Sequence, residues 1–375
     1  MSHANVYING QKVGYWPYGY NSFHFDITKY LKPGEKNTLA VRLENLPESS
    51  RWYPGAGLYR NVHLIITEDA YIPVWGTYIT TPSVNEKFAK VNVRTKVVLP
   101  EGADPAKYSV ETSVWNPNKQ KLTAVRTSLA QMKYNNDLAE QEFVIQDPSL
   151  WSPEMPALYS AETRLYEGDK LKDTYTTPFG IRSIEIIPDK GFFLNGKRTV
   201  FKGVCNHHDL GPLGAAVNDA AIRRQIRILK DMGCNAIRTS HNMPAPELIR
   251  ACDEMGMMIM AESFDEWNVA KCKNGYNLLF DEWAEKDLVN LLHNFRNNPS
   301  VVMWCIGNEV PNQWNEGDCK IAKWLQDICH REDPTRPVTQ GMDAPDAVVN
   351  NNFAAVMDVA GFNYRPFKYK INYKK

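Results

Sequence analysis

The periodicity of the apolar residues changes once along this chain of 375 residues, near Phe179-Gly180. Before that point, short stretches alternate apolar and polar residues between Pro, Gly and Asn, which is typical of antiparallel strands. After it, short apolar stretches alternate with amphipathic stretches of helical period. The sequence therefore predicts a multidomain protein in which a β part is followed by an α/β part.

The β part is long enough for two units. Asn9-Gly10, between alternating residues 5–8 and 12–16, is a strong hairpin signal. With further strands expected at residues 23–27, 38–44 and 59–67, residues 1–70 supply about five strands, too few for a complete sandwich. Residues 71–181 hold a second series, with strands expected at residues 90–98, 108–115, 139–146 and 157–167. This series suits an immunoglobulin-like sandwich.

The α/β part begins with a hairpin expected at residues 182–197. Six strands are then expected, at residues 200–204, 236–239, 257–261, 301–306, 337–340 and 356–362. Helices are expected between them, with Asn218 as an N-cap, Pro246 at a start and Gly256 just after an end. This alternation predicts a (β/α)₈ barrel over residues 182–375, truncated after about six strands. An open doubly wound sheet is the alternative, but no Gly-rich nucleotide loop follows the first strand.

Charge and cysteine content narrow the functional classes. Lys plus Arg and Asp plus Glu both number 43, so the basic excess of a nucleic-acid binder is absent. The longest apolar stretch, residues 301–306, is too short to span a membrane, and the first residues do not resemble a signal peptide. All seven cysteines lie from Cys205 onward without paired spacing, which argues against a disulfide framework. A reducing compartment such as the cytoplasm is the simpler interpretation, and a bacterial periplasm stays open.

Polar residues follow almost every predicted strand of the α/β part. In a barrel these positions meet at one mouth, where catalytic groups lie. The sets are residues 205–209, 238–242, 262–268, 308–309 and 363–365. Because surface polar residues would not favour one end of every strand, this clustering predicts a site that binds hydroxyl groups.

Glu309 is the sharpest catalytic candidate. A carboxyl group directly after a buried strand can protonate a poor leaving group when desolvation favours its protonated form. The alternative is a solvated loop residue or a helix cap. Glu262 and Glu266 lie at the same mouth, where a structural ion pair, for example with Arg238, is the alternative to a functional role.

Three histidines, His207, His208 and His241, also lie at strand ends. They could bind a zinc or binuclear centre, but neighbouring residues on a strand point to opposite faces, which argues against a metal for the His-His pair. Hydrogen bonding to hydroxyls or a structural role is the other interpretation. Trp267, Trp304 and Tyr364 are candidate walls for a sugar ring, with a core role as the alternative for Trp304.

At these residues the sequence resembles glycoside hydrolase family 2, which includes β-galactosidases, β-glucuronidases and β-mannosidases. The resemblance rests on residues 235–244 (NAIRTSHNMP), 293–300 (HNFRNNPS) with 304–309 (WCIGNE), 51–61 (RWYPGAGLYRN) and 203–209 (GVCNHHD). It implies a domain order: residues 1–70 as the C-terminal part of a jelly-roll sugar-binding domain, 71–181 as the immunoglobulin-like sandwich, and 182–375 as the TIM barrel.

The resemblance also implies roles for single residues. Glu309 matches the general acid/base, and Asn308 matches the neighbour that binds the 2-hydroxyl of the sugar. His241 and His207 resemble histidines that contact the sugar, and Tyr364 matches a tyrosine near the nucleophile. Glu266 matches a carboxylate that holds magnesium in some members, although Asn268 stands where those members have a metal-binding His. Arg238 and Trp267 are further candidates for substrate contact.

The activity that follows from the resemblance is a retaining exo-β-glycosidase, with terminal β-galactosides preferred because residues 207–214 and 361–364 are most similar to β-galactosidases. Members use a second Glu, after the seventh strand, as nucleophile, and no side-chain carboxylate follows Asp358 here. This chain is therefore expected to be an inactive fragment of an enzyme whose oligomeric state stays open. The alternatives are a β-glucuronidase, a non-catalytic carbohydrate-binding protein and a metal-dependent barrel hydrolase.

Overall fold

Antiparallel sheets come first along the chain and one parallel sheet comes last in the computed structural model, which describes residues 2–52, 57–131 and 138–374. The strands are β1 Ser2–Ile8, β2 Gln11–Trp16, β3 Leu39–Glu44, β4 Thr77–Val84, β5 Phe88–Lys96, β6 Tyr108–Trp115, β7 Lys121–Ser128, β8 Leu138–Gln146, β9 Tyr159–Glu167, β10 Lys170–Phe179, β11 Ile184–Ile187, β12 Gly191–Leu194, β13 Lys197–Arg198, β14 Gly203–Asn206, β15 Ala236–Thr239, β16 Met258–Glu262, β17 Val301–Asn308, β18 Val338–Met342 and β19 Val359–Phe362. The helices are α1 Asp219–Asp231, α2 Pro246–Met255, α3 Phe280–Phe295, α4 Cys319–Glu332, α5 Pro345–Asn350 and α6 Tyr369–Asn372.

The N-terminal sheet has the order β2-β1-β3, and β1 and β2 form the predicted hairpin. Asn9 and Gly10 make its turn with φ values of 52° and 82°, the left-handed conformation that a tight hairpin turn needs. The strands predicted at residues 23–27 and 59–67 do not form. Residues 28–30 instead make a 3-10 turn, and residues 59–67 belong to no sheet. The jelly-roll assignment of residues 1–70 stays a prediction.

The next unit is a sandwich of two antiparallel sheets, with strand orders β10-β9-β6-β7 and β4-β5-β8. In β5 the residues Ala89, Val91 and Val93 are buried and alternate with more exposed neighbours, the pattern of a strand with one face on a core. Side chains of both sheets form that core, among them Ile79, Val93, Val114, Phe143, Tyr159 and Phe179. The sandwich is confirmed, and its immunoglobulin-like type stays a prediction.

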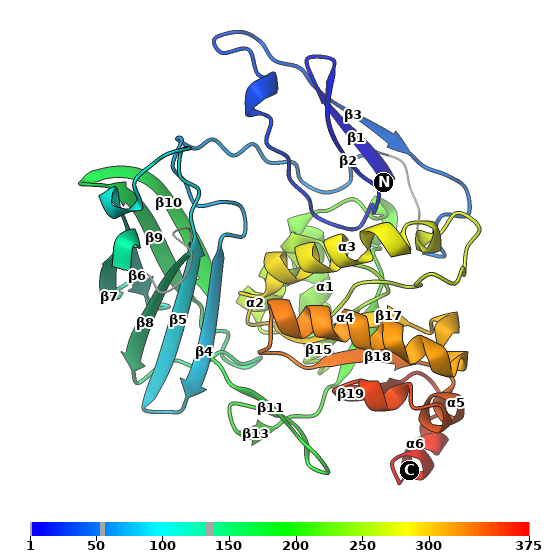
Figure 1. The fold of residues 1–375 in the computed structure, drawn as a ribbon. Helices are drawn as coiled ribbons and strands as arrows, with labels where there is room; N and C mark the ends of the chain where they lie inside the picture. Colours follow the sequence, from blue (N-terminus) through cyan, green and yellow to red (C-terminus); the bar gives the residue numbers. More distant parts are fainter. Residues whose placement is uncertain (1, 53–56, 132–137, 375) are drawn as a thin grey trace.

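The α/β part is a parallel sheet in the order β14-β15-β16-β17-β18-β19, so all six predicted strands pair in sequence order. The eight residues of β17 are all buried, which is why this strand reads as a continuous apolar stretch. The predicted helix ends are also found: the Asn218 side chain accepts a hydrogen bond from the Ala221 amide, and Gly256 ends α2 in the left-handed conformation. Figure 1 shows α1 to α4 covering one face of this sheet.

The three units contact one another through α3, α4 and the hairpin that precedes the barrel strands. In Figure 1 the N-terminal sheet lies beside α3, while the sandwich lies at the far end of the same helix. The Trp16 ring packs edge-on against Trp283 of α3, with ring centroids 5.2 Å apart. Within the described ranges, no helix is both long and apolar enough to cross a membrane.

Candidate active site

The carboxyl ends of the six parallel strands meet at one edge of the sheet, as the strand register requires. Asn308 pairs with Gly341 and Gly341 with Gly361, so the ends of β17, β18 and β19 are level. The residues that follow these ends therefore lie side by side, although they are separated by tens of residues in the sequence.

Glu309 is the first residue after β17. Its backbone N–H donates to the carbonyl of Gly341 (2.7 Å), and its φ of 46° turns the chain away from the strand. The carboxylate is half-buried, and its Oε1 accepts a hydrogen bond from Nδ2 of Asn363 after β19 (2.8 Å). Tyr364, which follows Asn363, has a raised pKa, first because of the negative charge of Glu309. A carboxyl group that is anchored but still reached by solvent can exchange a proton with a ligand.

Asn308, the last residue of β17, is 1% exposed and joins three elements. Its Oδ1 accepts from Nη2 of Arg238 (3.1 Å) and from Nδ2 of Asn363 (3.0 Å). Its Nδ2 donates to Oδ1 of Asp265 (3.0 Å). The amide is therefore held on both sides, directly next to Glu309.

Arg238 of β15 and Glu262 of β16 form a buried ion pair, with Nη2 and Oε1 2.7 Å apart. Burial is the largest single effect on Arg238 and would lower its pKa, but the charge and hydrogen bond of Glu262, together with the nearby Cys305 and Cys205, raise the pKa overall. Nδ1 of His241 lies 3.2 Å from Oε2 of the same carboxylate. Glu262 therefore has the structural ion-pair role, and it fixes the orientation of Arg238 and His241.

An aromatic cluster stands beside this ion pair. The His207 and His241 rings meet edge-on with centroids 5.2 Å apart, and the Trp52 ring lies 4.4 Å from His207 and 5.5 Å from His241. Burial first, and then the neighbouring His241, lowers the pKa of His207, which keeps its imidazole neutral near pH 7. A neutral imidazole can donate and accept hydrogen bonds with hydroxyl groups.

The neighbouring His208, which like His207 lies just beyond the end of β14, points elsewhere. Its ring stacks on Tyr20 with centroids 5.1 Å apart, and burial lowers its pKa to about 3. The two histidines of the doublet thus face different surroundings. The described part of the chain holds no group of three His, Cys, Asp or Glu side chains placed to bind a metal ion.

Two predicted site residues have other roles in the structure. Trp267 is fully buried: its Nε1 donates to the carbonyl of Ile306 (2.9 Å), and its ring packs beside Phe280 and Phe353, so the structure gives it a packing role, and its contact with a sugar stays a prediction. Glu266 is 4% exposed, and its carboxylate accepts backbone N–H groups from residues 271, 272 and 277. It holds this loop in place and does not face the cluster around Glu309.

These contacts also bear on magnesium. A magnesium ion prefers free carboxylate and water oxygens. Both oxygens of Glu266 are committed to backbone N–H groups, and Oδ1 of Asn268 accepts from Nδ2 of Asn312 (2.9 Å). These residues do not fit a magnesium ion in this arrangement.

From the sequence, Asp265 is expected only as one of several polar residues after a strand, with no role of its own. In the structure it forms a two-point ion pair with Arg51, which lies beyond β3 in the N-terminal unit (2.9 and 2.7 Å). Lys271 contributes a second ion pair at 3.2 Å. Arg51 and Asp265 are 214 residues apart in the sequence, so their spacing could not indicate that they form a pair.

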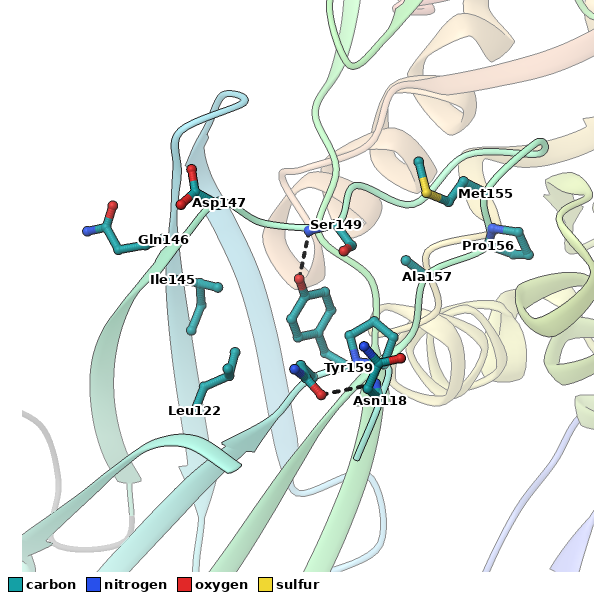
Figure 2. A pocket seen from close by; sticks show the side chains of 12 residues that line it. Asn118, Leu122, Ile145, Gln146, Asp147, Ser149, Met155, Pro156, Ala157 and Tyr159 are labelled. Atoms are coloured by element: carbon teal, nitrogen blue, oxygen red, sulfur yellow. Dashed lines mark hydrogen bonds between the residues drawn. The ribbon is translucent and has the colours of Figure 1, made fainter. Parts of the chain in front are cut away.

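Two hollows of the surface lie away from this cluster. Figure 2 shows one of about 450 Å³ at an end of the sandwich, where Asp147 and Tyr159 are the ionisable lining residues. The Tyr159 hydroxyl already accepts the Ser149 amide (2.8 Å). A larger hollow of about 1060 Å³ lies between the sandwich and the α/β part. Neither contains the paired acids and hydroxyl-binding groups found at the strand ends.

Two family descriptions match this chain. Residues 185–368 match the TIM barrel domain of the glycosyl hydrolases family 2, and residues 71–182 match a further domain described as glycosyl hydrolases family 2. Together the two matches cover more than half of the chain.

Individual proteins agree with this assignment. A β-galactosidase of Bacteroides ovatus is 40% identical over 393 residues, which cover 96% of this chain and 46% of the relative. A protein of Formosa agariphila described as a putative β-glucuronidase is 35% identical over 367 residues, covering 96% of this chain and 32% of the relative.

The fold agrees as well. The crystal structure of a family 2 member from Bacteroides cellulosilyticus superposes with a TM-score of 0.93 at 36% identity, over 100% of this chain and 48% of that one. The chain thus spans between about a third and about a half of the length of these relatives. With the parallel sheet, the acid at the end of β17 and these matches in agreement, the chain belongs to glycoside hydrolase family 2.

Proposed function

We propose that this chain is part of a retaining exo-β-glycosidase that removes terminal β-galactosyl residues, with Glu309 as its general acid/base. The observation that carries the proposal is the placement of Glu309, directly after the buried strand β17 and beside the anchored amide of Asn308. The 40% identical relative named as a β-galactosidase supports the choice of galactose.

In this mechanism Glu309 first protonates the leaving oxygen and later removes a proton from water. Asn308, His207 and His241 bind sugar hydroxyls, and Arg238 holds the amide of Asn308 from below. Tyr364, which is 71% exposed, stands beside Glu309 at the opening. Each role uses a group whose position is set by a strand end.

Retaining hydrolysis also needs a carboxylate nucleophile about 5–5.5 Å from the acid. The two other carboxylates bonded into this cluster are committed: Glu262 to Arg238 and His241, and Asp265 to Arg51 and Lys271. We infer that neither acts as nucleophile and that residues 1–375 alone show no more than trace hydrolysis.

The test uses the product of the complete reading frame that encodes residues 1–375. Glu309→Gln is expected to lower kcat/KM on an alkyl β-galactoside by about 10²–10⁴-fold, the range for lost acid/base catalysis. For a dinitrophenyl β-galactoside, whose leaving group needs no proton, Glu309→Gln is expected to lower kcat/KM less, because the first step then needs no acid. Glu285→Gln, an exposed glutamate on α3 paired with Arg331, is the matched control and keeps full activity.

Three other outcomes would change the proposal. Activity of Glu309→Gln within twofold of the unsubstituted protein would place the acid/base elsewhere. Affinity for galactosides without hydrolysis would indicate a carbohydrate-binding protein. Because the 35% identical relative is described as a putative β-glucuronidase, a nitrophenyl β-glucuronide is assayed in parallel, and preference for it would replace galactose by glucuronic acid.

A further inference from the structure

Asp265 lies three residues after β16, at a point where four polar groups from two units converge. Its carboxylate accepts two hydrogen bonds from Arg51, from Nε at 2.9 Å and Nη2 at 2.7 Å. Nζ of Lys271 approaches Oδ1 to 3.2 Å, and Nδ2 of Asn308 donates to the same oxygen at 3.0 Å. Its side chain is 12% exposed, so this carboxylate is largely screened from water.

These partners fix both the charge and the orientation of Asp265. Burial would raise the pKa of this carboxyl, but the hydrogen bonds from Arg51 and the charge of Lys271 hold the pKa at about 2. A carboxylate bound at two points by a guanidinium has one preferred orientation. Asp265 therefore presents an ionised oxygen to Asn308 near neutral pH.

The amide of Asn308 accordingly has one favourable orientation. Arg238 and Asn363 present donors, which require Oδ1, and Asp265 presents an acceptor, which requires Nδ2. Turning the amide by 180° would set its NH₂ group against the guanidinium and its oxygen against the carboxylate. An amide nitrogen carries two hydrogens, and Asp265 takes one of them. The other remains for a hydroxyl at the mouth.

We propose that Asp265 is a positioning residue that acts through Asn308: it fixes the amide so that the second Nδ2 hydrogen meets the 2-hydroxyl of the bound sugar. Arg51, from the N-terminal unit, in turn fixes Asp265, and Lys271 adds a hydrogen bond to the backbone carbonyl of Asn308. This inference rests on the proposed glycosidase function. It assigns the N-terminal unit a part in orienting a group of the α/β part.

The test compares two substrates in the product of the complete reading frame: nitrophenyl β-galactoside and its 2-deoxy analogue. In Asp265→Asn the carboxylate no longer forces the orientation of the amide. The kcat/KM for the 2-hydroxyl substrate is expected to fall about 10- to 100-fold, mostly in kcat, because this hydrogen bond strengthens in the transition state. The kcat/KM for the 2-deoxy substrate is expected to fall less than about threefold.

Equal losses on both substrates would show a merely structural role and overturn the proposal. A double variant tests whether Asp265 acts through Asn308. In a protein that already carries Asn308→Ala, adding Asp265→Asn should not lower kcat/KM further for either substrate. An additional loss there would mean that Asp265 acts by another route. Asp327→Asn, an exposed residue paired with Lys323 on α4, is the matched control with an unchanged substrate ratio.

Folding is checked by thermal unfolding. If Asp265→Asn does not fold, Arg51→Gln is measured instead, because it keeps the carboxylate and removes its two-point partner; a smaller shift in the same direction is expected, and an unchanged ratio would refute the proposal. Absence of hydrolysis of either substrate by the unsubstituted protein would instead refute the proposed function on which the inference rests. The two failures are therefore distinguishable.

Discussion

Asp287 on α3 shows how one buried side chain joins distant segments. Its Oδ1 accepts hydrogen bonds from Nε1 of Trp16 (2.8 Å) and Nδ2 of Asn21 (2.7 Å), and its Oδ2 accepts the hydroxyl of Tyr276. The side chain has no exposed surface. The N-terminal unit is thereby fastened to α3 by a carboxylate that burial makes costly to ionise.

This cost predicts a pH dependence of stability. Burial raises the pKa of Asp287 to about 6, above the value of about 4 in an unfolded chain. The folded state therefore binds the proton more tightly, and the stabilisation is fully present below about pH 4 and lost as the pH rises to about 6. In Asp287→Asn, the free energy of unfolding from urea titrations should fall less over pH 4–6, by about 1.4 kcal/mol for each pKa unit removed. The exposed Asp281→Asn is the control, and parallel pH profiles for Asp287→Asn and the unsubstituted protein would contradict the assignment.

At the scale of single residues, position after a strand was a sound guide to the site. Glu309, Asn308, Arg238, His241 and His207 were expected together and are found together, and their roles in sugar binding stay predictions. Position alone could not say whether a side chain four or five residues after the end of β16 points inward or outward. Trp267 turns into the core and Glu266 toward its own loop for that reason.

Among the elements, β18 passes unusually close to the site. A Cβ on Gly341 would lie 2.5 Å from Nη2 of Arg238 and 3.0 Å from Nδ2 of Asn363. These are the two donors that hold the amide of Asn308. A side chain at position 341 would therefore move the groups that orient the site.

Gly341→Ala is accordingly expected to lower kcat/KM for β-galactoside hydrolysis roughly tenfold or more, since a misplacement of about 1 Å can cost about 10²-fold in rate. The substitution should leave the midpoint of thermal unfolding nearly unchanged while it lowers kcat/KM. Gly317→Ala, whose added Cβ would meet no atom within 4 Å, serves as the matched control. Unchanged kinetics for Gly341→Ala would mean that Arg238 can shift without consequence.

Helices and strands were predictable where burial of one face gives the apolar residues a regular spacing. They were less predictable where a strand forms only because a neighbouring strand pairs with it. The six parallel strands and their helices follow from apolar runs and caps. The strands β4, β7 and β10 were missed, and β7 explains why: it has no buried residue, so its sequence lacks a clear alternation. Residues 59–67 have the composition of a strand but no partner, and Val62, Leu64 and Ile66 are exposed by 61%, 69% and 84%. A strand exists only where a neighbour pairs with it.

For the molecule as a whole, Arg182 is the main polar connection between the sandwich and the α/β part. It follows β10, is 8% exposed, and donates to the backbone carbonyls of Pro299 (2.6 Å) and Val301 (2.7 Å). The Trp151 indole adds a hydrogen bond to the carbonyl of Asp253 (2.9 Å). The two units therefore share buried contacts and should unfold together.

Arg182→Ala removes the side-chain donor of the buried Pro299 carbonyl and leaves a cavity, while the Val301 carbonyl keeps its hydrogen bond from Nε of Arg336 (2.6 Å). Each unsatisfied buried group costs about 1–3 kcal/mol. Scanning calorimetry should show a lower thermal midpoint and a transition that broadens or splits, as the sandwich loses its coupling to the rest. Arg42→Ala, an exposed arginine paired with Glu44, is the control with an unchanged midpoint. A single, unshifted transition for Arg182→Ala would show that apolar contacts alone couple the units.

The hairpin of β11 and β12 affects how substrate and product can reach and leave the site. Phe192 and Leu194 pack with Trp151 against Ala236, Met258 and Val302, at the amino ends of β15, β16 and β17. Apolar side chains cover the amino ends of these three strands, while Glu309 lies at the other end. Under the proposed function, the substrate therefore enters and the product leaves at the end of the strands that carries Glu309. A product sugar that stays bound beside Glu309 prevents substrate from binding, so product inhibition should be competitive with substrate.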